Sequence, residues 1–385
     1  MRNLLKRALF LVFKGVLFFN KKKPAIDASS IKNILIIQAG GVGDVLRIFP
    51  AVKSLCDNLP ASSISFLVFP GVKDIFKLLP NKERIREIID YEPEGTHKGI
   101  FKRMSLILLL RKNKYDLIYV PSRGKGTDGT LLMAFFAGAR HRIGFDVEGA
   151  GFLNTVSLKF KNNVSISEQN LFLLDAAGLK VKREKTVLDI PEEDMALARG
   201  LTGEGGFSTI ISLHPGAVWN ARYRCWPEEN YISLVKALVS EGAQVVIIGS
   251  KDEMGGNIAR SVNHNAVIDV TGKLTIPQLA AVIKLSDMLI GNDSGPLHIA
   301  EATSTPYIGI FGPTSPRQVL SNPPNITGIG LHGNLSCGPC YTHQGVFKPV
   351  CEDTRCRNIE TVLVKEVFAA AKGFMKTINE RGFAL

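Results

Sequence analysis

From residue 31 onward, short apolar segments alternate along the chain with segments that have a helical pattern of hydrophobic positions. In the first half, residues 34–37, 63–69 and 117–120 have the composition of buried strands, and residues 47–58 have the pattern of a helix. A strand, a helix and a second strand in this order build a parallel sheet. The pattern therefore predicts an α/β domain, which a helix over residues 167–175 closes.

The second half repeats this alternation more clearly, after a glycine-rich stretch at residues 200–206 that marks a loop near the domain junction. The predicted strands are residues 209–213, 244–249, 267–270, 288–291 and 307–311, and the predicted helices are residues 228–241, one entered through the capping box at 275–278, and one beginning at Pro296. Parallel sheets bind ligands beyond the carboxyl ends of their strands. Two facing sheets would therefore offer a cleft between two domains.

Length and composition agree with two folded domains. A chain of 385 residues is longer than a domain with a single core usually is, and 45% of its residues are hydrophobic. The net charge of +12 suggests an anionic partner, but seven of the basic residues lie among the first 23, where there is no acidic residue. The rest of the chain carries no compact basic stripe with interleaved aromatic residues. This distribution argues against a nucleic-acid partner.

The basic N-terminus also contains an apolar stretch, residues 8–19, which is interrupted by Lys14. A membrane-spanning helix needs about 20 mainly apolar residues. The stretch is too short, and the lysines at residues 21–23, followed by Pro24, do not resemble a signal-peptide cleavage site. We expect residues 1–23 to lie on a membrane surface. A terminal helix docked on the protein itself is the alternative.

A glycine turn, with the sequence Gln-Ala-Gly-Gly-Val-Gly-Asp at residues 38–44, follows the first predicted strand. A dinucleotide-binding turn would need a third glycine where Leu46 stands and an acidic residue after the second strand, and a phosphate loop would need a lysine and a hydroxyl residue. Neither pattern is present. We expect Gly41 and Gly43 to let the backbone approach a ligand closely, and Asp44 to serve as a carboxylate that accepts a proton. Asp44 could instead be a simple helix cap.

A second candidate cluster, Asp293, Ser294, Gly295 and His298, follows the predicted strand at residues 288–291. Its composition is typical of a helix N-terminus, whose free N–H groups and dipole favour an anion such as a diphosphate. His298 would lie within about the first turn of that helix. A cluster that only caps the helix is the alternative interpretation.

Two further charged residues are candidates for contacts with the same ligand. Arg224 precedes a Trp-Pro pair and a new helix, from where it could reach a diphosphate, although a surface arginine is the simpler interpretation. Glu253 follows the strand at residues 244–249, where an acidic residue could accept hydrogen bonds from ribose hydroxyls. Any solvated loop also carries acidic residues.

Taken together and in this order, the segments resemble glycosyltransferase family 9, the family of ADP-heptose:lipopolysaccharide heptosyltransferases. The matching segments are residues 43–50, 168–174, 214–216, 224–227, Glu253, 269–272, 292–298 and 311–314. The resemblance implies a GT-B fold, in which two Rossmann-like domains with parallel sheets face a cleft. It divides the chain into a membrane-surface segment (1–24), an acceptor-binding domain (25–190), a nucleotide-sugar-binding domain (191–358) and a C-terminal helix (359–385).

The resemblance also implies an inverting transfer that requires no metal or other cofactor. Asp44 would be the general base, and Ser294, Gly295 and His298 would contact the donor diphosphate, with Asp293 beside the donor. Glu253 would bind the ribose. At the position of Arg224 the family often has lysine, so the charge is kept but the hydrogen-bond geometry differs.

Four cysteines, Cys337, Cys340, Cys351 and Cys356, depart from the better studied members of that family. Their spacing, C-x2-C-x10-C-x4-C, could hold a structural zinc ion below the nucleotide domain. Two disulfides and four free thiols are the alternatives, of which the disulfides are disfavoured in the cytoplasm.

We therefore expect a glycosyltransferase that works at the cytoplasmic face of the membrane, with a nucleotide-sugar donor, ADP-heptose by resemblance, and a lipid-linked glycan acceptor such as the lipopolysaccharide core. Another sugar-nucleotide enzyme of the same fold, such as an epimerase, would act on the donor without any acceptor. A non-catalytic glycan- or nucleotide-binding protein is the alternative from a different class.

Overall fold

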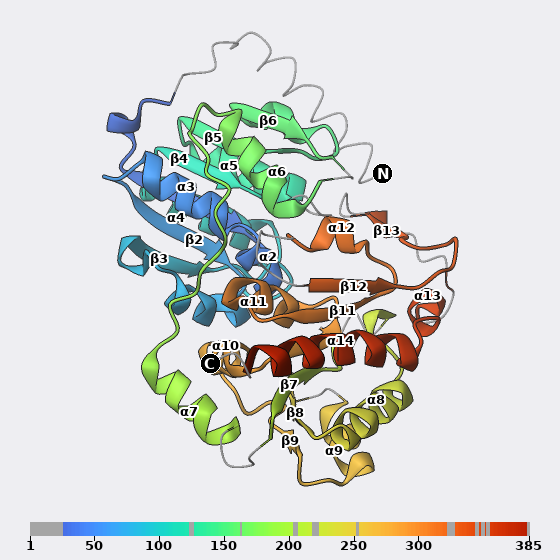
Figure 1. The fold of residues 1–385 in the computed structure, drawn as a ribbon. Helices are drawn as coiled ribbons and strands as arrows, with labels where there is room; N and C mark the ends of the chain where they lie inside the picture. Colours follow the sequence, from blue (N-terminus) through green and yellow to red (C-terminus); the bar gives the residue numbers. More distant parts are fainter. Residues whose placement is uncertain are drawn as a thin grey trace.

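The computed structural model describes residues 26–122, 127–161, 164–202, 207–217, 223–251, 254–321, 328–342, 346–347, 351 and 355–382. Over these residues the chain forms two six-stranded sheets, and every strand pair in them is parallel (Figure 1). The expected α/β architecture with two parallel sheets is thereby confirmed.

The first sheet contains β1 to β6 in the order β3-β2-β1-β4-β5-β6. Its strands are β1 (Asn33–Gln38), β2 (Ser63–Val68), β3 (Ile85–Asp90), β4 (Leu117–Val120), β5 (His141–Asp146) and β6 (Val156–Lys159). The connecting helices are α2 (Val42–Leu46), α3 (Phe49–Asn58), α4 (Ile100–Lys112), α5 (Thr127–Ala137) and α6 (Ile166–Asp175), with the 3-10 helices η1 (Ala28–Ser30), η2 (Pro70–Leu78), η3 (Lys82–Arg84) and η4 (Ala150–Leu153).

The second sheet has the order β12-β11-β10-β7-β8-β9. Its strands are β7 (Thr209–His214), β8 (Ala243–Ile247), β9 (Val267–Asp269), β10 (Met288–Asn292), β11 (Tyr307–Phe311) and β12 (Gly328–His332), and β13 (Tyr341–Thr342) and β14 (Val346–Phe347) form a separate antiparallel pair. The helices are α7 (Glu192–Thr202), α8 (Glu228–Ser240), α9 (Gly255–Val262), α10 (Ile276–Leu285), α11 (Gly295–Thr303), α12 (Pro316–Val319), α13 (Arg357–Glu360) and α14 (Val364–Gly382).

Numbered in chain order, each sheet has the strand order 3-2-1-4-5-6 of the dinucleotide-binding folds. The order reverses between β1 and β4 in the first sheet and between β7 and β10 in the second. Ligands of such sheets bind beyond the carboxyl ends of the strands at this reversal. The glycine turn after β1 and the cluster after β10 therefore both occupy the positions at which a ligand is expected.

Apolar side chains on the two faces of the first sheet belong to different cores. Ile34 and Ile36 of β1 pack in the core that contains residues of α3 and α6, whereas Leu35 and Ile37 pack with α4 and α5. In Figure 1, α3 and α6 accordingly cover the face toward the viewer. In the second domain α8 and α14 pack on one face, while α10 and α11 contribute to the core shared with the first domain.

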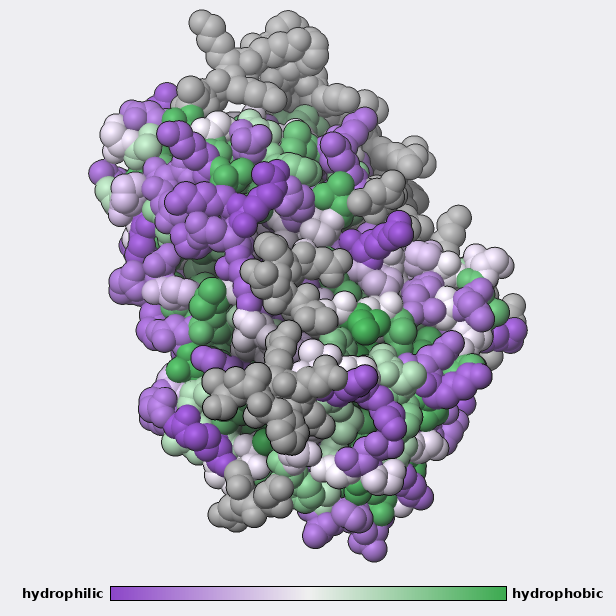
Figure 2. All heavy atoms as spheres, in the orientation of Figure 1, coloured by the Kyte–Doolittle hydropathy of each residue, from purple (hydrophilic) through white to green (hydrophobic). Residues whose placement is uncertain are grey.

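The two domains are joined by an extended segment, residues 176–191, which runs along the front of the molecule to α7 (Figure 1). α7 packs against α10, and η2 of the first domain also contacts α10. Figure 2 shows this face of the molecule, where hydrophilic residues cover most of the first domain and hydrophobic residues form small groups.

Candidate active site

The glycine turn after β1 holds the carboxylate of Asp44 at the start of α2. The Gly41 N–H donates a hydrogen bond to Asp44 Oδ2 over 3.0 Å, and the guanidinium of Arg47 makes an ion pair with Asp44 Oδ1. Arg47 is itself fixed, because its Nε donates to the Gly43 carbonyl over 3.2 Å. The Arg47 side chain is only 8% exposed, whereas that of Asp44 is 41% exposed. The result is an oriented carboxylate that solvent, or a hydroxyl of a ligand, can reach.

Close contacts, rather than unusual backbone angles, require glycine at residues 40 and 43 of this turn. A Cβ atom on Gly40 would lie 2.6 Å from Asp44 Oδ2, and one on Gly43 would lie 2.4 Å from His298 Cδ2. Gly41 has open space around it. From the sequence, Gly41 and Gly43 were expected to approach a ligand, which stays a prediction; neither the contact of Gly43 with His298 nor the role of Gly40 was predicted.

The start of α11 meets the start of α2 across the domain junction. A Cβ atom on Gly295 would be 3.4 Å from Val42 Cβ, and α2 and α11 are in contact along their first turns. Gly43 therefore lies beside both His298 and the N-terminus of α11. The glycine turn and two residues of the second cluster, Gly295 and His298, come together in this way.

His298 is held in place by a buried carboxylate. Its Nδ1 lies 2.9 Å from Glu301 Oε2, and the other oxygen of Glu301 accepts hydrogen bonds from the Ser321 N–H at 2.7 Å and the Tyr307 hydroxyl at 3.2 Å. Burial, reinforced by the Glu301 carboxylate, raises the pKa of Tyr307 and keeps its proton on the hydroxyl. The opposite edge of the imidazole faces Gly43. Sequence reasoning missed Glu301 and Tyr307; the three-residue spacing of His298 and Glu301 on one helix was the available signal.

Ser294, the residue before α11, does not cap that helix with its side chain. Its hydroxyl oxygen lies 2.9 Å from His214 Nδ1 and donates to the Asn292 carbonyl over 3.0 Å. The Asn292 side chain in turn bonds to the Pro215 and Gly216 carbonyls, the Trp226 N–H and the Tyr231 hydroxyl. The Asn292 amide thus fixes the segment after β7 against β10, with hydrogen bonds at both its nitrogen and its oxygen.

Arg224 and Asp293 form an ion pair next to this segment. Arg224 Nη1 lies 3.4 Å from Asp293 Oδ2, which also accepts a hydrogen bond from the Thr314 hydroxyl over 2.7 Å. The guanidinium carbon of Arg224 lies 5.0 Å from the centre of the Tyr341 ring. Burial opposes the charge of Arg224, but the Asp293 carboxylate and neighbouring tyrosines raise the pKa of Arg224, so the cation is retained.

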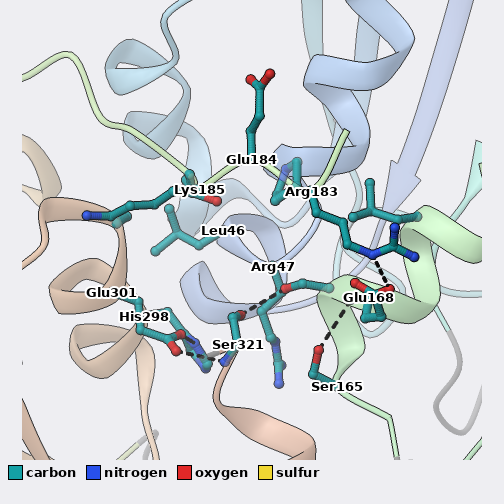
Figure 3. A pocket seen from close by; sticks show the side chains of 15 residues that line it. Leu46, Arg47, Ser165, Glu168, Arg183, Glu184, Lys185, His298, Glu301 and Ser321 are labelled. Carbon is teal, nitrogen blue, oxygen red and sulfur yellow. Dashed lines mark hydrogen bonds and ion pairs between the residues drawn. The ribbon is translucent and has the colours of Figure 1, made fainter. Parts of the chain in front are cut away.

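A cavity of about 230 Å³ lies beside this junction, between α2, α6, α11 and the segment that joins the domains (Figure 3). Arg47 and His298 lie on one side of it and Arg183, Glu184 and Lys185 on the other. The sequence analysis singled out none of these three residues of the joining segment. Arg183 pairs with Glu168 at 2.6 Å, Glu184 pairs with Lys53 at 2.9 Å, and burial lowers the pKa of Lys185.

Two of the expectations concern other parts of the chain. Glu253 lies outside the described residues, so the expected ribose contact stays a prediction. The thiols of Cys337, Cys340, Cys351 and Cys356 are free. Burial raises the pKa of Cys340 and Cys356, and neighbouring thiols add to both effects. In the described part of the chain, no group of three or more potential ligands has the arrangement of a metal site.

Comparison with known proteins agrees with this architecture. The chain is 29% identical to lipopolysaccharide heptosyltransferase 3 of Escherichia coli over 71% of its own length and 81% of that protein. The structure of ADP-heptose lps heptosyltransferase II from Escherichia coli superimposes with a TM-score of 0.69 at 21% identity, covering 90% of this chain and 99% of that one. A family 9 glycosyltransferase from Veillonella parvula superimposes with a TM-score of 0.72 at 19% identity, covering 92% and 99%.

The two parallel sheets, with the ligand-binding ends of both meeting at α2 and α11, define a GT-B fold. The model of glycosyltransferase family 9 (heptosyltransferase) matches residues 103–351. The chain belongs to this family and is a glycosyltransferase. No helix among its described residues is long and apolar enough to cross a membrane.

Proposed function

We propose that this glycosyltransferase transfers a heptosyl group from ADP-heptose to a lipopolysaccharide-core or related surface-glycan acceptor. The names of its relatives support the donor and the acceptor class. The observation that carries the proposal is the exposed Asp44 carboxylate, which Gly41 and Arg47 orient at the junction with α11. The nucleotide-sugar domain would be residues 191–358 and the acceptor domain residues 25–190.

In the proposed mechanism Asp44 accepts the proton of the acceptor hydroxyl. The oxygen of that hydroxyl attacks the anomeric carbon of the donor at the same time. The bond from that carbon to the diphosphate breaks, and the configuration at the carbon inverts. The free N–H groups at the start of α11, together with Arg224 and His298, would stabilise the negative charge of the leaving diphosphate. This division of roles requires no metal ion.

The base assignment predicts a large and selective loss of rate. Asp44→Asn keeps the shape of the side chain but removes its basicity, so transfer should fall by about 10²- to 10⁴-fold. Asp57→Asn is the matched control, because Asp57 carries a similarly exposed carboxylate, at 40% exposure, in an ion pair with Lys53. Rates would be measured with purified protein, ADP-heptose and a heptose-deficient lipopolysaccharide core. Equal rates for the two variants would contradict the assignment.

The same assay separates the finer parts of the proposal. Product with an anomeric configuration opposite to that of the donor, formed at an unchanged rate in EDTA, is expected for an inverting, metal-independent transfer. Conversion of the donor in the absence of any acceptor would indicate an epimerase instead.

A separate experiment, calorimetric titration with ADP, UDP and GDP, tests the identity of the donor. We expect selective ADP binding that is lost in Glu253→Ala. Absence of product with every acceptor would indicate a binding protein.

A structural metal at the four cysteines is a separate proposal, supported by their spacing. Thiolates suit both zinc and iron, so both metals would be measured in purified protein. About one equivalent of metal that is lost in Cys337→Ser and kept in Cys56→Ser is expected. Less than about 0.2 equivalents in the unaltered protein would reject this proposal.

We also propose that residues 1–23 hold the enzyme on the cytoplasmic face of the membrane. The proposal rests on their seven basic residues and on the apolar stretch between them. Vesicle flotation of the full chain would be compared with that of a chain starting at Ala25. Equal flotation of the two would contradict the role of this segment.

A further inference from the structure

Helix α4 turns an unusually apolar face toward solvent. It buries only Leu106 and Leu110, whereas Phe101 is 86% exposed, Ile100 73% and Leu108 60%. Met104 and Leu109 are also exposed. Together with the neighbouring Phe136 of α5, these residues make up six of the ten large hydrophobic side chains that are exposed in the described part of the chain. Scattered exposed hydrophobic residues are ordinary, but a concentration on one helix is not.

Apolar residues lie around most of α4, so that one apolar side is buried and another is exposed. Ile100, Phe101, Met104 and Leu108 fall within about 100° of one another around the helix axis, and Leu106 and Leu110 point to the opposite side. Arg111 Nη1 donates a hydrogen bond to the Phe136 carbonyl over 3.5 Å, which places Phe136 beside α4. The exposed side chain of Phe136 therefore extends the apolar surface. We call the surface formed by Ile100, Phe101, Met104, Leu108, Leu109 and Phe136 the α4 surface.

The segment that carries the α4 surface is rich in basic residues. Between Gly95 and Tyr115 the chain contains six basic residues and no acidic one. These are Lys98, Lys102, Arg103, Arg111, Lys112 and Lys114, and within the described residues no ion pair to a carboxylate involves any of them. An exposed apolar helical face on a segment whose lysines and arginines make no carboxylate ion pair among the described residues is complementary to a layer of anionic lipid headgroups above acyl chains.

Length and position favour a helix that lies in the membrane surface rather than across it. Thirteen residues of helix extend for about 20 Å, which is less than the roughly 30 Å of the hydrocarbon core. α4 begins after β3, at the carboxyl edge of the first sheet, and Asp44 follows β1 at the same edge. A membrane against α4 would therefore lie against the proposed acceptor domain.

We propose that the α4 surface is a membrane-docking surface for anionic phospholipids, whose binding adds to the binding proposed for residues 1–23. Phe101, Ile100 and Leu108 would enter the boundary between headgroups and acyl chains, and the flanking lysines and arginines would contact lipid phosphates. The inference goes beyond the proposed transfer reaction. It is tested without donor or acceptor, so it fails or holds independently of the sugar that the enzyme transfers.

The test is flotation of the full chain with vesicles of phosphatidylcholine alone or with added phosphatidylglycerol. Binding to the anionic vesicles should fall by about tenfold or more in the double variant Phe101→Ser with Leu108→Ser, because two apolar side chains no longer enter the lipid. The matched control is Leu197→Ser with Leu363→Ser, which alters two exposed leucines on other surfaces, 40% and 46% exposed. The control should bind like the unaltered protein.

A second pair of variants tests the charges. Lys102→Glu with Arg103→Glu should also reduce binding to the anionic vesicles by about tenfold or more, whereas Lys236→Glu with Lys284→Glu changes the net charge equally on other surfaces and should reduce it far less. High salt should weaken the binding of the unaltered protein. Thermal unfolding of each variant shows that the fold is intact, which is expected because the altered side chains are exposed.

Unchanged flotation of both α4 variants would overturn the proposal. If the N-terminal segment covered the α4 surface, the variants would float normally, and residues 1–25 would become more susceptible to protease. If a second copy covered it, the variants would float normally but would lower the mass measured by light scattering. Each of these results excludes the lipid as the partner of α4.

Discussion

Asn292 shows how one buried side chain positions several candidate site residues. It donates to two carbonyls of the segment that follows β7 and accepts from Trp226 N–H and the Tyr231 hydroxyl, at distances between 2.7 and 3.1 Å. The side chain is completely buried. A buried polar group that loses its partner costs about 1 to 3 kcal/mol.

Replacing Asn292 by alanine should therefore lower the free energy of unfolding by about 3 kcal/mol or more, because several buried groups lose their partners at once. Donor affinity should fall as well, since Asn292 no longer holds Pro215 and Gly216, the segment that follows β7. Asn230→Ala, on the partly exposed surface of α8, is the control and should cost less than about 1 kcal/mol. Urea unfolding measures both, and a similar loss in the two variants would contradict the structural role of Asn292.

At the scale of single residues, the sequence indicated chemical groups but not their partners. Asp44, Asp293 and His298 were chosen because carboxylates and a histidine follow predicted strands. Their partners Arg47 and Glu301 each lie three residues further along the chain, so the spacing was the only signal for them, and it is weak because a charged residue on a helix is most often solvated. What the sequence could not show is that the packing of α2 on α11 brings Gly43 beside His298.

At the scale of elements, the apolar strands were mostly predicted closely, the edge strand β9 among them, and four strands were missed. β1, β2, β4 and β7 to β11 all coincide with predicted segments to within a few residues. β3, β5, β6 and β12 went unrecognised. β3, β6 and β12 have mostly half-buried residues and lie at or near sheet edges, so they lack the continuous apolar run of a central strand.

The helix expected over residues 47–58 is wrong at its beginning. The chain forms α2, then leaves the helix at Arg47 and Ile48 and starts α3 at Phe49, with Pro50 in the first turn. Proline lacks an N–H and is tolerated in the first turn of a helix but not in its interior. Pro50 was therefore the signal for the boundary. The capping box at Thr275 and Gln278, in contrast, is confirmed.

The contact between α2 and α11 predicts that alanine at Gly43 lowers stability and transfer rate, whereas alanine at Gly41 changes both little. A Cβ atom on Gly43 would lie 2.4 Å from His298 Cδ2, so Gly43→Ala must push α2 and α11 apart or displace the imidazole. The cost to stability should be about 1 to 3 kcal/mol, with a larger fractional loss of transfer rate. Gly41→Ala is the matched control, because Gly41 has open space and a φ of −76° that alanine also adopts. Thermal unfolding and transfer rates that are the same for both would count against the contact.

At the scale of the whole molecule, the two sheets share one apolar core. The largest cluster of buried side chains contains residues of β1, α3 and η2 from the first domain and of α10, α11 and β11 from the second. Ile75 of η2 is completely buried in this cluster, and η2 contacts α10. A shared core of this kind couples the unfolding of the two domains, whereas domains joined only by a linker would unfold separately.

This coupling can be tested because both tryptophans, Trp219 and Trp226, belong to the second half of the sequence. Leu131 is completely buried in a core formed by residues of the first domain alone. Leu131→Ala should destabilise the protein by about 2 to 5 kcal/mol. If the domains unfold together, the tryptophan fluorescence transition should move to lower urea by the same amount as the transition in far-ultraviolet circular dichroism. Leu132→Ala, at a partly exposed neighbouring position, should move both transitions far less. A tryptophan transition that stays in place while the dichroism curve splits into two steps would show that the second domain unfolds on its own.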